Sequence, residues 1–355
     1  MKWKAFVTAA ALFAAAVLIS DDVSAATKVS AHSAIVIDGH SGEILWEKNA
    51  EQRSLIASTT KIMTGLLIAE DCSLQEVFCI PDSAVGIEGS SLYLKSGELL
   101  TIEELLYGMM LHSGNDAATA LAIYHSGSVE NFVQKMNHKA AALGLSGTSF
   151  ANPHGLDSQD HYSTALDLAK LTAYAMNNPV FRKVVSTKTI SMSTRSYTNH
   201  NKLLWRSVGV IGVKTGYTEA AGRILVSCAQ RQGKRLIVVT ISAPDDWKDH
   251  QSLYDHCFGK FSPRIVLRSG VDSVSVPVGG VKEEFAIAVP QNSVVCLSES
   301  DDLFDVRYEV PAFAYLPVVA GEPAGEAVIF RNGTEVDRVP LFWKFSILED
   351  NERGR

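Results

Sequence analysis

Strand-like segments at both ends of a long helical stretch constrain the fold of this chain more than any other feature. Residues 33–38 form the apolar run of a buried strand, and residues 43–47 return after a Gly-His-Ser-Gly turn. Later strands are indicated at 209–213, 223–228 and 235–241. The intervening residues have apolar side chains at helical spacing, in segments 56–70, 102–110, 116–125 and 128–143. We therefore predict a sheet assembled from both ends of this region around a helical middle.

Other segments of the middle have weaker patterns. Thr164 and Asp167 have the spacing of a capping box at the start of a helix. Residues 90–94 are expected to be extended, and strands are expected from Val185 onward. The helical middle should therefore end before the later strands of the sheet begin.

The last part of the chain has a different character. A predicted helix at 249–261 is followed by short alternating runs of apolar and polar residues, and Asn332-Gly333 is a strong hairpin signal. A length of 355 residues fits two domains. We therefore predict a first domain at 27–262, a small all-β domain at 263–347, and a tail at 348–355.

The N-terminus has the layout of a secretory signal peptide. Two lysines precede an uncharged stretch at 5–19, and Val23-Ser-Ala25 offers small residues to a signal peptidase. The alternative is a retained transmembrane anchor, which needs about 20 apolar residues, and Asp21 and Asp22 cut the stretch short. We expect residues 1–25 to be removed and the mature protein to be extracytoplasmic, in the cell wall or peripheral to the membrane.

Charge and cysteine content exclude several classes of function. Lys+Arg 32 against Asp+Glu 39 gives a net charge of −7 without a basic run, so nucleic acid is not an expected partner. The five cysteines are too few and odd in number for a disulfide framework, although Cys72 and Cys79 could pair around a short turn. No Cys-x-x-Cys or His-x-x-x-His spacing indicates zinc, and we expect no metal and no cofactor.

Three short motifs carry the chemistry. They are Ser58-Thr-Thr-Lys61 opening a helix, Ser113-Gly-Asn115 between two helices, and Lys214-Thr-Gly216 on a strand. Each motif alone is a weak signal. All three in this order, each in the local structure that it needs, are typical of penicillin-binding proteins and serine β-lactamases.

The first motif pairs a nucleophile with its base. Positions i and i+3 share a helix face, so the Lys61 amine can reach the Ser58 hydroxyl and take its proton as general base. Three effects should lower the pKa of Lys61: the helix N-terminus, burial, and the nearby cation Lys214. The alternative is a helix-capping serine beside a solvated lysine, and the two other motifs argue against it.

The second motif lies between two helices. Ser113 is expected to relay a proton between Lys61 and the leaving amine, and Asn115 to position Lys61 and the substrate backbone. The alternative is a polar loop in which Asn115 caps the next helix.

The third motif should lie on an edge strand that can pair with an extended peptide. Lys214 then supplies a positive charge for a substrate carboxylate, and Thr215 supplies a hydroxyl. Gly216 leaves room for the substrate to approach the backbone. The backbone N–H groups of Ser58 and Tyr217 would form the oxyanion hole. The alternative is that Lys-Thr-Gly is only a β-turn.

At this point the sequence resembles the D-alanyl-D-alanine carboxypeptidases, the low-molecular-mass penicillin-binding proteins of serine peptidase family S11. The resemblance spans residues 30–261 and includes stretches beyond the motifs, at 33–39, 56–64, 110–117, 152–156 and 212–218. It implies a β-lactamase/transpeptidase-like α/β (α+β) domain, an antiparallel sheet with helices on both faces and an all-helical subdomain, and then a β-rich domain.

The resemblance also implies the reaction. Ser58 would attack the D-Ala-D-Ala bond of a peptidoglycan stem peptide, the terminal D-alanine would leave, and water would hydrolyse the acyl-enzyme. β-Lactam antibiotics would acylate the same serine and so inhibit it.

The sequence departs from the family in two places. Residues 346–355 are too short and acidic for the amphipathic membrane helix that ends many members, which leaves open how the protein is retained at the wall. Residues 244–250 lack an arginine that some members use for the terminal carboxylate, so carboxylate binding should depend more on Lys214 and Thr215. The Asp-Asp-Trp and Asn-Pro-His-Gly-Leu forms are most similar to members from Gram-positive spore formers, which makes a spore-cortex role an alternative.

Three other functions are alternatives. A serine β-lactamase needs a carboxylate base for deacylation, and no Glu-x-x-x-Asn loop occurs between Asn115 and Lys214. A D,D-endopeptidase that cuts cross-links would use the same residues. A non-catalytic wall-binding protein would have no use for a Ser-Lys pair. Of the histidines, His112 is expected at the rim of the site, and His154 is expected to be structural.

Overall fold

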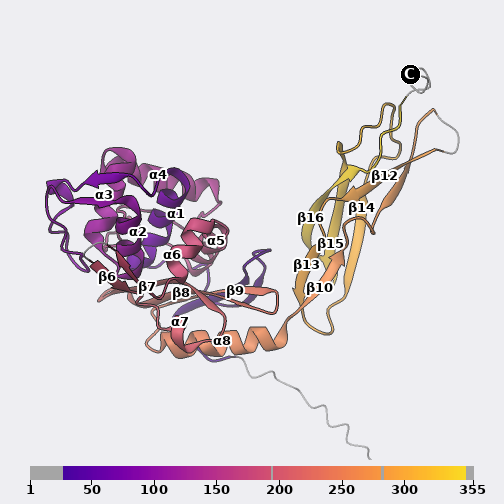
Figure 1. Cartoon of the computed structure of the whole chain (residues 1–355). Coiled ribbons are helices and arrows are strands. Elements are labelled where there is room, and N and C mark those ends of the chain that lie inside the picture. The colour runs from indigo at the N-terminus through magenta and orange to yellow at the C-terminus, as the bar shows by residue number, and fades with distance from the viewer. Residues whose placement is uncertain (1–26, 193–194, 281–283, 349–355) are drawn as a thin grey trace, which may run out of the picture.

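The computed structural model describes residues 27–192, 195–280 and 284–348, so the predicted signal peptide and most of the predicted tail lie outside the described residues. Figure 1 shows a larger body with helices around a sheet and an elongated body of strands, joined after helix α8 (Asp246–Lys260). No helix in the described ranges is both long and apolar enough to cross a membrane.

The central sheet is built from both ends of the first body, as predicted. Its strand order is β2-β1-β9-β8-β7 and every neighbouring pair is antiparallel. The strands are β1 (Ser33–Asp38), β2 (Ile44–Lys48), β7 (Val210–Thr218), β8 (Gly222–Arg231) and β9 (Lys234–Ile241). Strand β7 is therefore an edge strand, and the last strands of the body lie beside the first.

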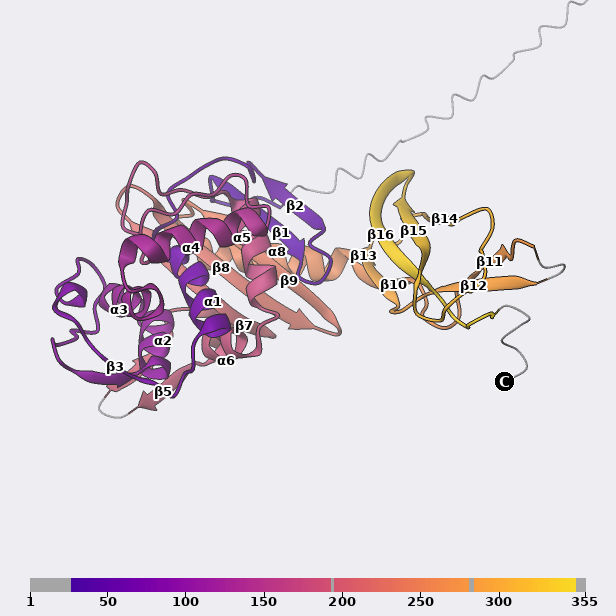
Figure 2. The same ribbon diagram turned by 90° about the horizontal axis from the view of Figure 1, so that it is seen from above.

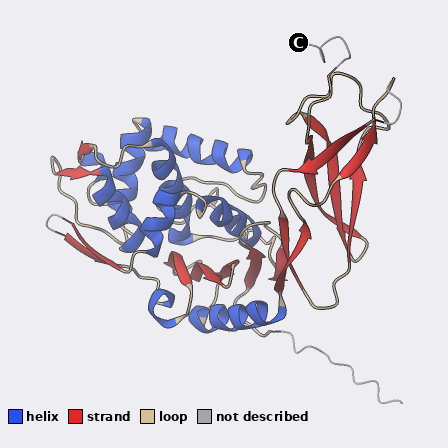
Figure 3. Ribbon diagram, turned by 45° about the vertical axis from the view of Figure 1, so that its right-hand side comes forward, coloured by secondary structure: helices blue, strands red, loops and turns tan. Residues whose placement is uncertain are grey.

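The sheet separates two apolar cores, because successive side chains of a strand point to opposite faces. In β1, Ile35 and Ile37 pack with the helical subdomain, whereas Val36 packs with Leu253 and Tyr254 of α8. Figure 3 shows the sheet between these helices and the pair α7 (Leu203–Arg206) and α8. Helices cover both faces, which confirms the predicted fold class.

The helical subdomain covers one face of the sheet (Figure 2). It comprises the 3-10 turn η1 (Ala57–Thr60), α1 (Lys61–Asp71), α2 (Ile102–Leu111), α3 (Asn115–Ser126), α4 (Val129–Ala142), α5 (Ala165–Ala175) and α6 (Pro179–Ser186). Smaller elements complete it: β3 (Val77–Cys79), η2 (Asp82–Ala84), β4 (Leu99–Thr101), β5 (Thr189–Met192) and β6 (Arg195–Thr198). Helix α1 is buried over most of its length, which places its first residue, Lys61, in the interior.

Three local predictions need correction. Residues 90–94 are not extended throughout, because Tyr93 has φ +57°, and the carboxylate of Asp116 accepts the backbone N–H groups of Leu92 and Leu94 on either side of it. Asp167 does not close a capping box, since its carboxylate accepts from Gly147 and Thr148 instead. Strands do not begin at Val185, which lies inside α6.

The elongated body is an all-β structure with its own small cores. A five-stranded antiparallel sheet has the order β11-β12-β16-β15-β14, and β10 pairs with β13. The strands are β10 (Ser262–Leu267), β11 (Val274–Pro277), β12 (Phe285–Pro290), β13 (Val294–Ser298), β14 (Phe304–Glu309), β15 (Pro323–Arg331) and β16 (Thr334–Trp343). Asn332 and Gly333, both with positive φ, form the hairpin turn between β15 and β16.

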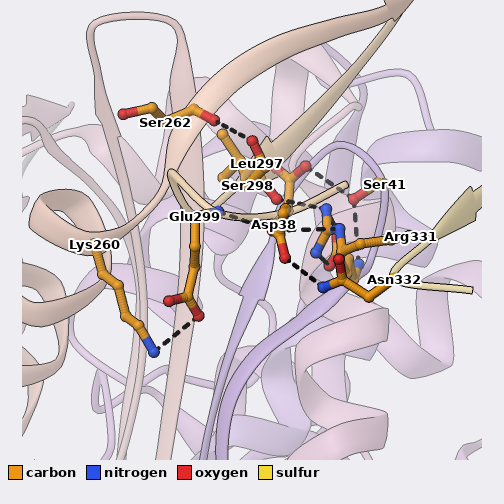
Figure 4. Close-up of polar contacts among 11 residues, drawn as sticks. Asp38, Ser41, Lys260, Ser262, Leu297, Ser298, Glu299, Arg331 and Asn332 are labelled. Carbon is orange, nitrogen blue, oxygen red and sulfur yellow. Dashed lines mark hydrogen bonds and ion pairs between the residues drawn. The ribbon is translucent and has the colours of Figure 1, made fainter. Parts of the chain in front are cut away.

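Polar contacts connect the two bodies (Figure 4). Arg331 at the end of β15 forms an ion pair with Glu43, which precedes β2. Within the β body it also donates to the Leu297 carbonyl at 2.6 Å. Lys260 at the end of α8 forms a second ion pair with Glu299 at 2.8 Å. Ion pairs of Arg331 and Lys260 therefore link the peptidase body to the β body.

Candidate active site

A cleft with two lobes lies beside edge strand β7, between the start of α1 and the α2–α3 connection. One lobe has a volume of about 380 Å³ and the other about 540 Å³, and Ser58, Ser90 and Tyr217 line both. The residues of all three sequence motifs lie in or directly beneath this cleft. The structure therefore brings together segments that are more than 150 residues apart in the sequence.

Ser58 is presented by a constrained turn. Ala57 directly before it is buried and has φ +44°, in the left-handed region that non-glycine residues rarely adopt. The turn is held by a short hydrogen bond from Thr60 Oγ1 to the Ala57 carbonyl, 2.8 Å long. Gly155, with φ +96°, packs so closely there that a Cβ would lie 1.9 Å from the same carbonyl oxygen. The backbone around Ser58 is thus fixed before any substrate arrives.

The Lys61 amine lies at the centre of the site and is 0% exposed. Its Nζ is 3.0 Å from Ser58 Oγ, 2.6 Å from Asn115 Oδ1 and 2.7 Å from the His154 carbonyl oxygen. The two carbonyl oxygens can only accept hydrogen bonds. A neutral amine would donate its two N–H groups to them and keep its lone pair for the Ser58 hydroxyl proton.

The surroundings of Lys61 favour that neutral state. Burial lowers its pKa well below the ordinary value, the charge of Lys214 lowers it further, and Asp116 partly opposes both. Asp116 is itself buried, and its carboxylate holds the 91–94 loop through Ser91 and two backbone N–H groups. The site therefore provides a lysine that can act as a base.

Asn115 begins α3 and is held on three sides. Its backbone N–H donates to Ser90 at 2.7 Å, and its Nδ2 donates to the Glu88 carbonyl at 2.6 Å. The amide oxygen is therefore the atom that faces Lys61. These contacts fit the predicted role in positioning Lys61.

Ser113 and Lys214 form the second polar pair of the site. Lys214 Nζ donates to Ser113 Oγ at 3.1 Å and to the Thr215 carbonyl at 2.9 Å, and the side chain is 1% exposed. Burial lowers the pKa of Lys214 to about 7. Ser113 adopts φ +68°, which turns it toward this amine. Lys214 thus contacts Ser113 and lies beneath the cleft, while Thr215 lines the 380 Å³ lobe.

Gly216 and Tyr217 continue β7 past the nucleophile. A Cβ at Gly216 would lie 3.3 Å from both the Ser58 nitrogen and the Ala57 Cβ, so a larger residue would push the strand and the nucleophile turn slightly apart. The Tyr217 side chain is exposed at the cleft. The backbone N–H groups of Ser58 and Tyr217 therefore belong to adjoining segments, as an oxyanion hole requires.

Sequence reasoning missed the basic side chains of the 380 Å³ lobe. Arg223 lines this lobe with Lys202 and His200, and we refer to it below as the basic lobe. The Arg223 NH2 group donates to both oxygens of buried Asp246, at 2.7 and 2.9 Å. No motif marks Arg223, because it enters the cleft through its pairing with Tyr217 across β7 and β8. The lobe thus contains an arginine although residues 244–250 lack one.

The two histidines considered from the sequence have different surroundings. His112 is exposed, and its ring centroid is 5.2 Å from that of His200 in the basic lobe. His154 lines the 540 Å³ lobe and contributes its backbone carbonyl to Lys61. Burial lowers the pKa of the His154 imidazole to about 3, so this ring is neutral.

The potential metal ligands and the cysteines of the described residues form neither a metal-ligating cluster nor a disulfide. The described part of the chain contains no group of three or more His, Cys, Asp or Glu side chains arranged to hold a metal ion. All five cysteines are free, so Cys72 and Cys79 do not pair.

Comparisons with known proteins show which family this chain resembles. The family model described as D-alanyl-D-alanine carboxypeptidase matches residues 20–245. The chain is 31% identical to D-alanyl-D-alanine carboxypeptidase DacF of Bacillus subtilis over 88% of this chain and 84% of that protein. It is 35% identical to D-alanyl-D-alanine carboxypeptidase DacA of Escherichia coli over 92% of this chain and 86% of that protein.

Solved structures give the same result. Penicillin-binding protein 5 from Haemophilus influenzae superposes with a TM-score of 0.81 and 28% identity, covering 91% of this chain and 98% of that one. The Streptomyces K15 DD-transpeptidase superposes with a TM-score of 0.63 and 32% identity, covering 65% of this chain and 98% of that one. The first match extends over both bodies, and the second is limited to about two thirds of the chain.

Proposed function

This chain belongs to the D-alanyl-D-alanine carboxypeptidase family, serine peptidase family S11, and we propose that it removes the terminal D-alanine from peptidoglycan stem peptides through an acyl-enzyme on Ser58. The observation that carries the proposal is the Lys61 amine, 3.0 Å from Ser58 Oγ, with carbonyl oxygens at its two other contacts. A Ser-Lys pair arranged in this way is a nucleophile with its base. A solvated lysine would have no such partners.

Acylation begins when Lys61 takes the hydroxyl proton of Ser58. Ser58 Oγ attacks the carbonyl carbon of the D-Ala-D-Ala bond, and the backbone N–H groups of Ser58 and Tyr217 stabilise the oxyanion. Ser113, which is hydrogen-bonded to Lys214, relays the proton: its hydroxyl gives a proton to the leaving nitrogen and takes one from Lys61, which becomes neutral again. The C–N bond breaks, D-alanine leaves, and an ester remains on Ser58.

Deacylation reverses these roles. A water molecule loses a proton to Lys61 and attacks the ester carbonyl, and Ser58 leaves with a proton returned to its oxygen. β-Lactams enter by the same acylation step, and inhibition by them is a general property of this family. Asn115 fixes the Lys61 amine in both half-reactions.

The charge of the basic lobe supports a substrate with a free carboxylate. Arg223 uses one NH2 group for Asp246, which leaves its other N–H donors for a ligand, and Lys202 adds a second charge. Thr215 offers a hydroxyl on the same side. We therefore assign carboxylate binding to Thr215 and Arg223, with buried Lys214 contributing its charge from below.

The domain limits and the location belong to the same proposal. We propose a peptidase domain at 27–262 and a β-rich domain at 263–347. The core of the helical subdomain and the two cores of the β body support this division, and Leu297 of β13 packs against the α8 side of the peptidase body. The N-terminal sequence supports export by a signal peptide at 1–25. The mature enzyme would then meet its substrate in the wall.

One incubation tests the reaction. Residues 26–355 are mixed with monomeric pentapeptide and cross-linked muropeptides, and the products are read by mass spectrometry. Loss of one D-alanine from the pentapeptide with intact cross-links is the expected result. Cleaved cross-links would make the protein an endopeptidase, and no product with wild-type protein would refute the proposed substrate. Ser58→Ala is the matched control and should give neither product nor penicillin labelling.

A further inference from the structure

His161 is a fully buried histidine with no part in the mechanism above. Its Nε2 lies 2.7 Å from Thr60 Oγ1, and its Nδ1 lies 3.0 Å from the backbone nitrogen of Ala151. Phe150 packs edge-on against the ring, with centroids 5.9 Å apart. The imidazole therefore bridges the residue next to Lys61 and the segment that leads to His154.

The direction of each hydrogen bond follows from the available protons. The Ala151 N–H can only donate, so Nδ1 of His161 accepts and carries no proton. The Thr60 hydroxyl gives its single proton to the Ala57 carbonyl. Thr60 Oγ1 must then accept from Nε2. The ring is neutral, with its proton on Nε2, and every donor in this chain of contacts has one acceptor.

These hydrogen bonds connect two segments that both lie next to the nucleophile. At one end is the carbonyl of Ala57, whose left-handed backbone directly precedes Ser58. At the other end, Ala151 opens the segment whose His154 carbonyl accepts from Lys61. A shift of the ring would therefore change the position of Ser58 relative to the acceptor that orients its base.

We propose that His161 is a positioning residue for acylation, whose neutral imidazole fixes the turn that carries Ser58 against the segment that carries the His154 carbonyl. This inference rests on the proposed role of Ser58 as nucleophile. His161 acts through Thr60 and Ala151 and touches no reacting atom. Reactions that depend on near-attack geometry lose about 100-fold for a displacement of about 1 Å.

The charges that face His161 fit this role. Burial, and then the charge of Lys61, lower its pKa to about 4. The neighbouring His154 has its pKa lowered to about 3 by burial, Lys61 and His161. Below about pH 4, a protonated Nδ1 would face the Ala151 N–H and the contact would become repulsive.

The test measures β-lactam acylation in single turnover, which separates the binding constant from the saturating rate. His161→Leu should lower the saturating rate roughly 10- to 100-fold with little change in binding. His161→Gln keeps one acceptor and one donor and should recover to within about fivefold of wild type. The exposed His138 on α4 provides matched controls, and H138L and H138Q should acylate like wild type.

Wild-type acylation by H161L, or a slow rate that H161Q does not recover, would overturn the proposal. A pH profile adds a readout that packing alone would not change. Below about pH 4 the wild-type rate should fall more steeply than the H161Q rate, because only the wild type has the imidazole to protonate. Parallel profiles would also overturn the proposal.

Thr60→Val is the second variant in case H161L fails to fold. It removes the hydroxyl that links the ring to Ala57 and should slow acylation as H161L does, whereas T60S should not. An unchanged rate in T60V would contradict the proposed chain of contacts. Because the assay uses a β-lactam, failure to release D-alanine from peptides would refute the proposed substrate and leave this test intact.

Discussion

The peptidase body and the β body differ in where their clustered charged side chains lie, which is in the interior in the first and at the surface in the second. In the first, Lys61, Lys214 and Asp116 are almost completely buried within one cleft. In the second, Arg338 forms exposed ion pairs with Glu309, Glu326 and Glu335.

Burying a charge is costly unless it is paired or neutralised, whereas exposed pairs contribute little. Burial of these lysines therefore lowers the stability of the folded peptidase body, and it is also what makes the Lys61 amine reactive. The β body contains no comparable cluster among its described residues.

The largest expected effect comes from removing the buried base. Lys61→Met should lower β-lactam acylation by at least about 10⁴-fold, because Lys61 is the only side chain among the described residues that is hydrogen-bonded to the Ser58 hydroxyl and can take its proton. Arg338→Met in the β body is the matched control. It should leave acylation unchanged and change the free energy of unfolding very little, because exposed ion pairs contribute little to stability. Equal losses of acylation in Lys61→Met and Arg338→Met would mean that the buried charge of the peptidase body has no special role in the reaction.

Arg223 tests whether the basic lobe binds a carboxylate. Arg223→Met should lower kcat/KM for a peptide with a free C-terminal carboxylate by about 10- to 100-fold, since a hydrogen bond to a charged group contributes about 1.5–3 kcal/mol. The same peptide with a C-terminal amide should show almost no further loss. A loss of equal size for both peptides would mean that Arg223 serves the fold alone. Arg223→Lys keeps the charge, so its kcat/KM for the carboxylate peptide should lie between those of wild type and Arg223→Met.

Two glycines compare backbone crowding in the two bodies. Gly155 and Gly321 both have positive φ, but a Cβ at Gly155 would lie 1.9 Å from the Ala57 carbonyl, and nothing lies within 4 Å at Gly321. Gly155→Ala should cost about 3 kcal/mol or more and slow acylation. Gly321→Ala should cost about 1–2 kcal/mol and leave acylation unchanged. Denaturant unfolding with parallel acylation assays measures both, and similar stability losses would argue against a strained nucleophile turn.

Acid should affect the peptidase body first. Burial lowers the pKa of His154 and His250 to about 3, and of His161 and His200 to about 4, whereas residues 263–355 contain no histidine. Below about pH 6.5 these histidines bind protons in the unfolded chain but stay neutral in the folded peptidase body. The free energy of unfolding of the peptidase body should therefore fall as the pH drops toward 4.

Calorimetry can separate the two transitions, and a bound β-lactam should identify that of the peptidase body. That transition should move down by several degrees between pH 7 and pH 4. A larger shift in the β body would contradict the account.

Much of the fold follows from local patterns. The strands at both chain ends, the helices at 102–111 and 115–126 and the Asn332-Gly333 hairpin all have short-range signals, and the structure contains them. Helix α6 was not predicted, although Asn178 caps it and Pro179 stands at its start.

The three motifs predicted which residues meet at the cleft, but their surroundings depend on tertiary contacts. Arg223 reaches the cleft only through strand pairing with Tyr217, and His161 reaches Thr60 from about 100 residues away. Residues 90–94 have an extended pattern, yet the Asp116 carboxylate takes backbone N–H groups that a neighbouring strand would otherwise pair. Such contacts join residues that are too far apart in the sequence for a local pattern to predict them.

The most direct measurement locates the covalent adduct. After brief exposure to a β-lactam, trypsin cleavage behind Arg53 and Lys61 releases an eight-residue peptide, 54–61, that contains Ser54, Ser58, Thr59 and Thr60. Fragmentation by tandem mass spectrometry should place the adduct on Ser58. The K61M variant lacks the second cleavage site, so its longer tryptic peptide, 54–95, should carry no adduct. An adduct on any other residue, or none on wild-type protein, would contradict the assignment of the nucleophile.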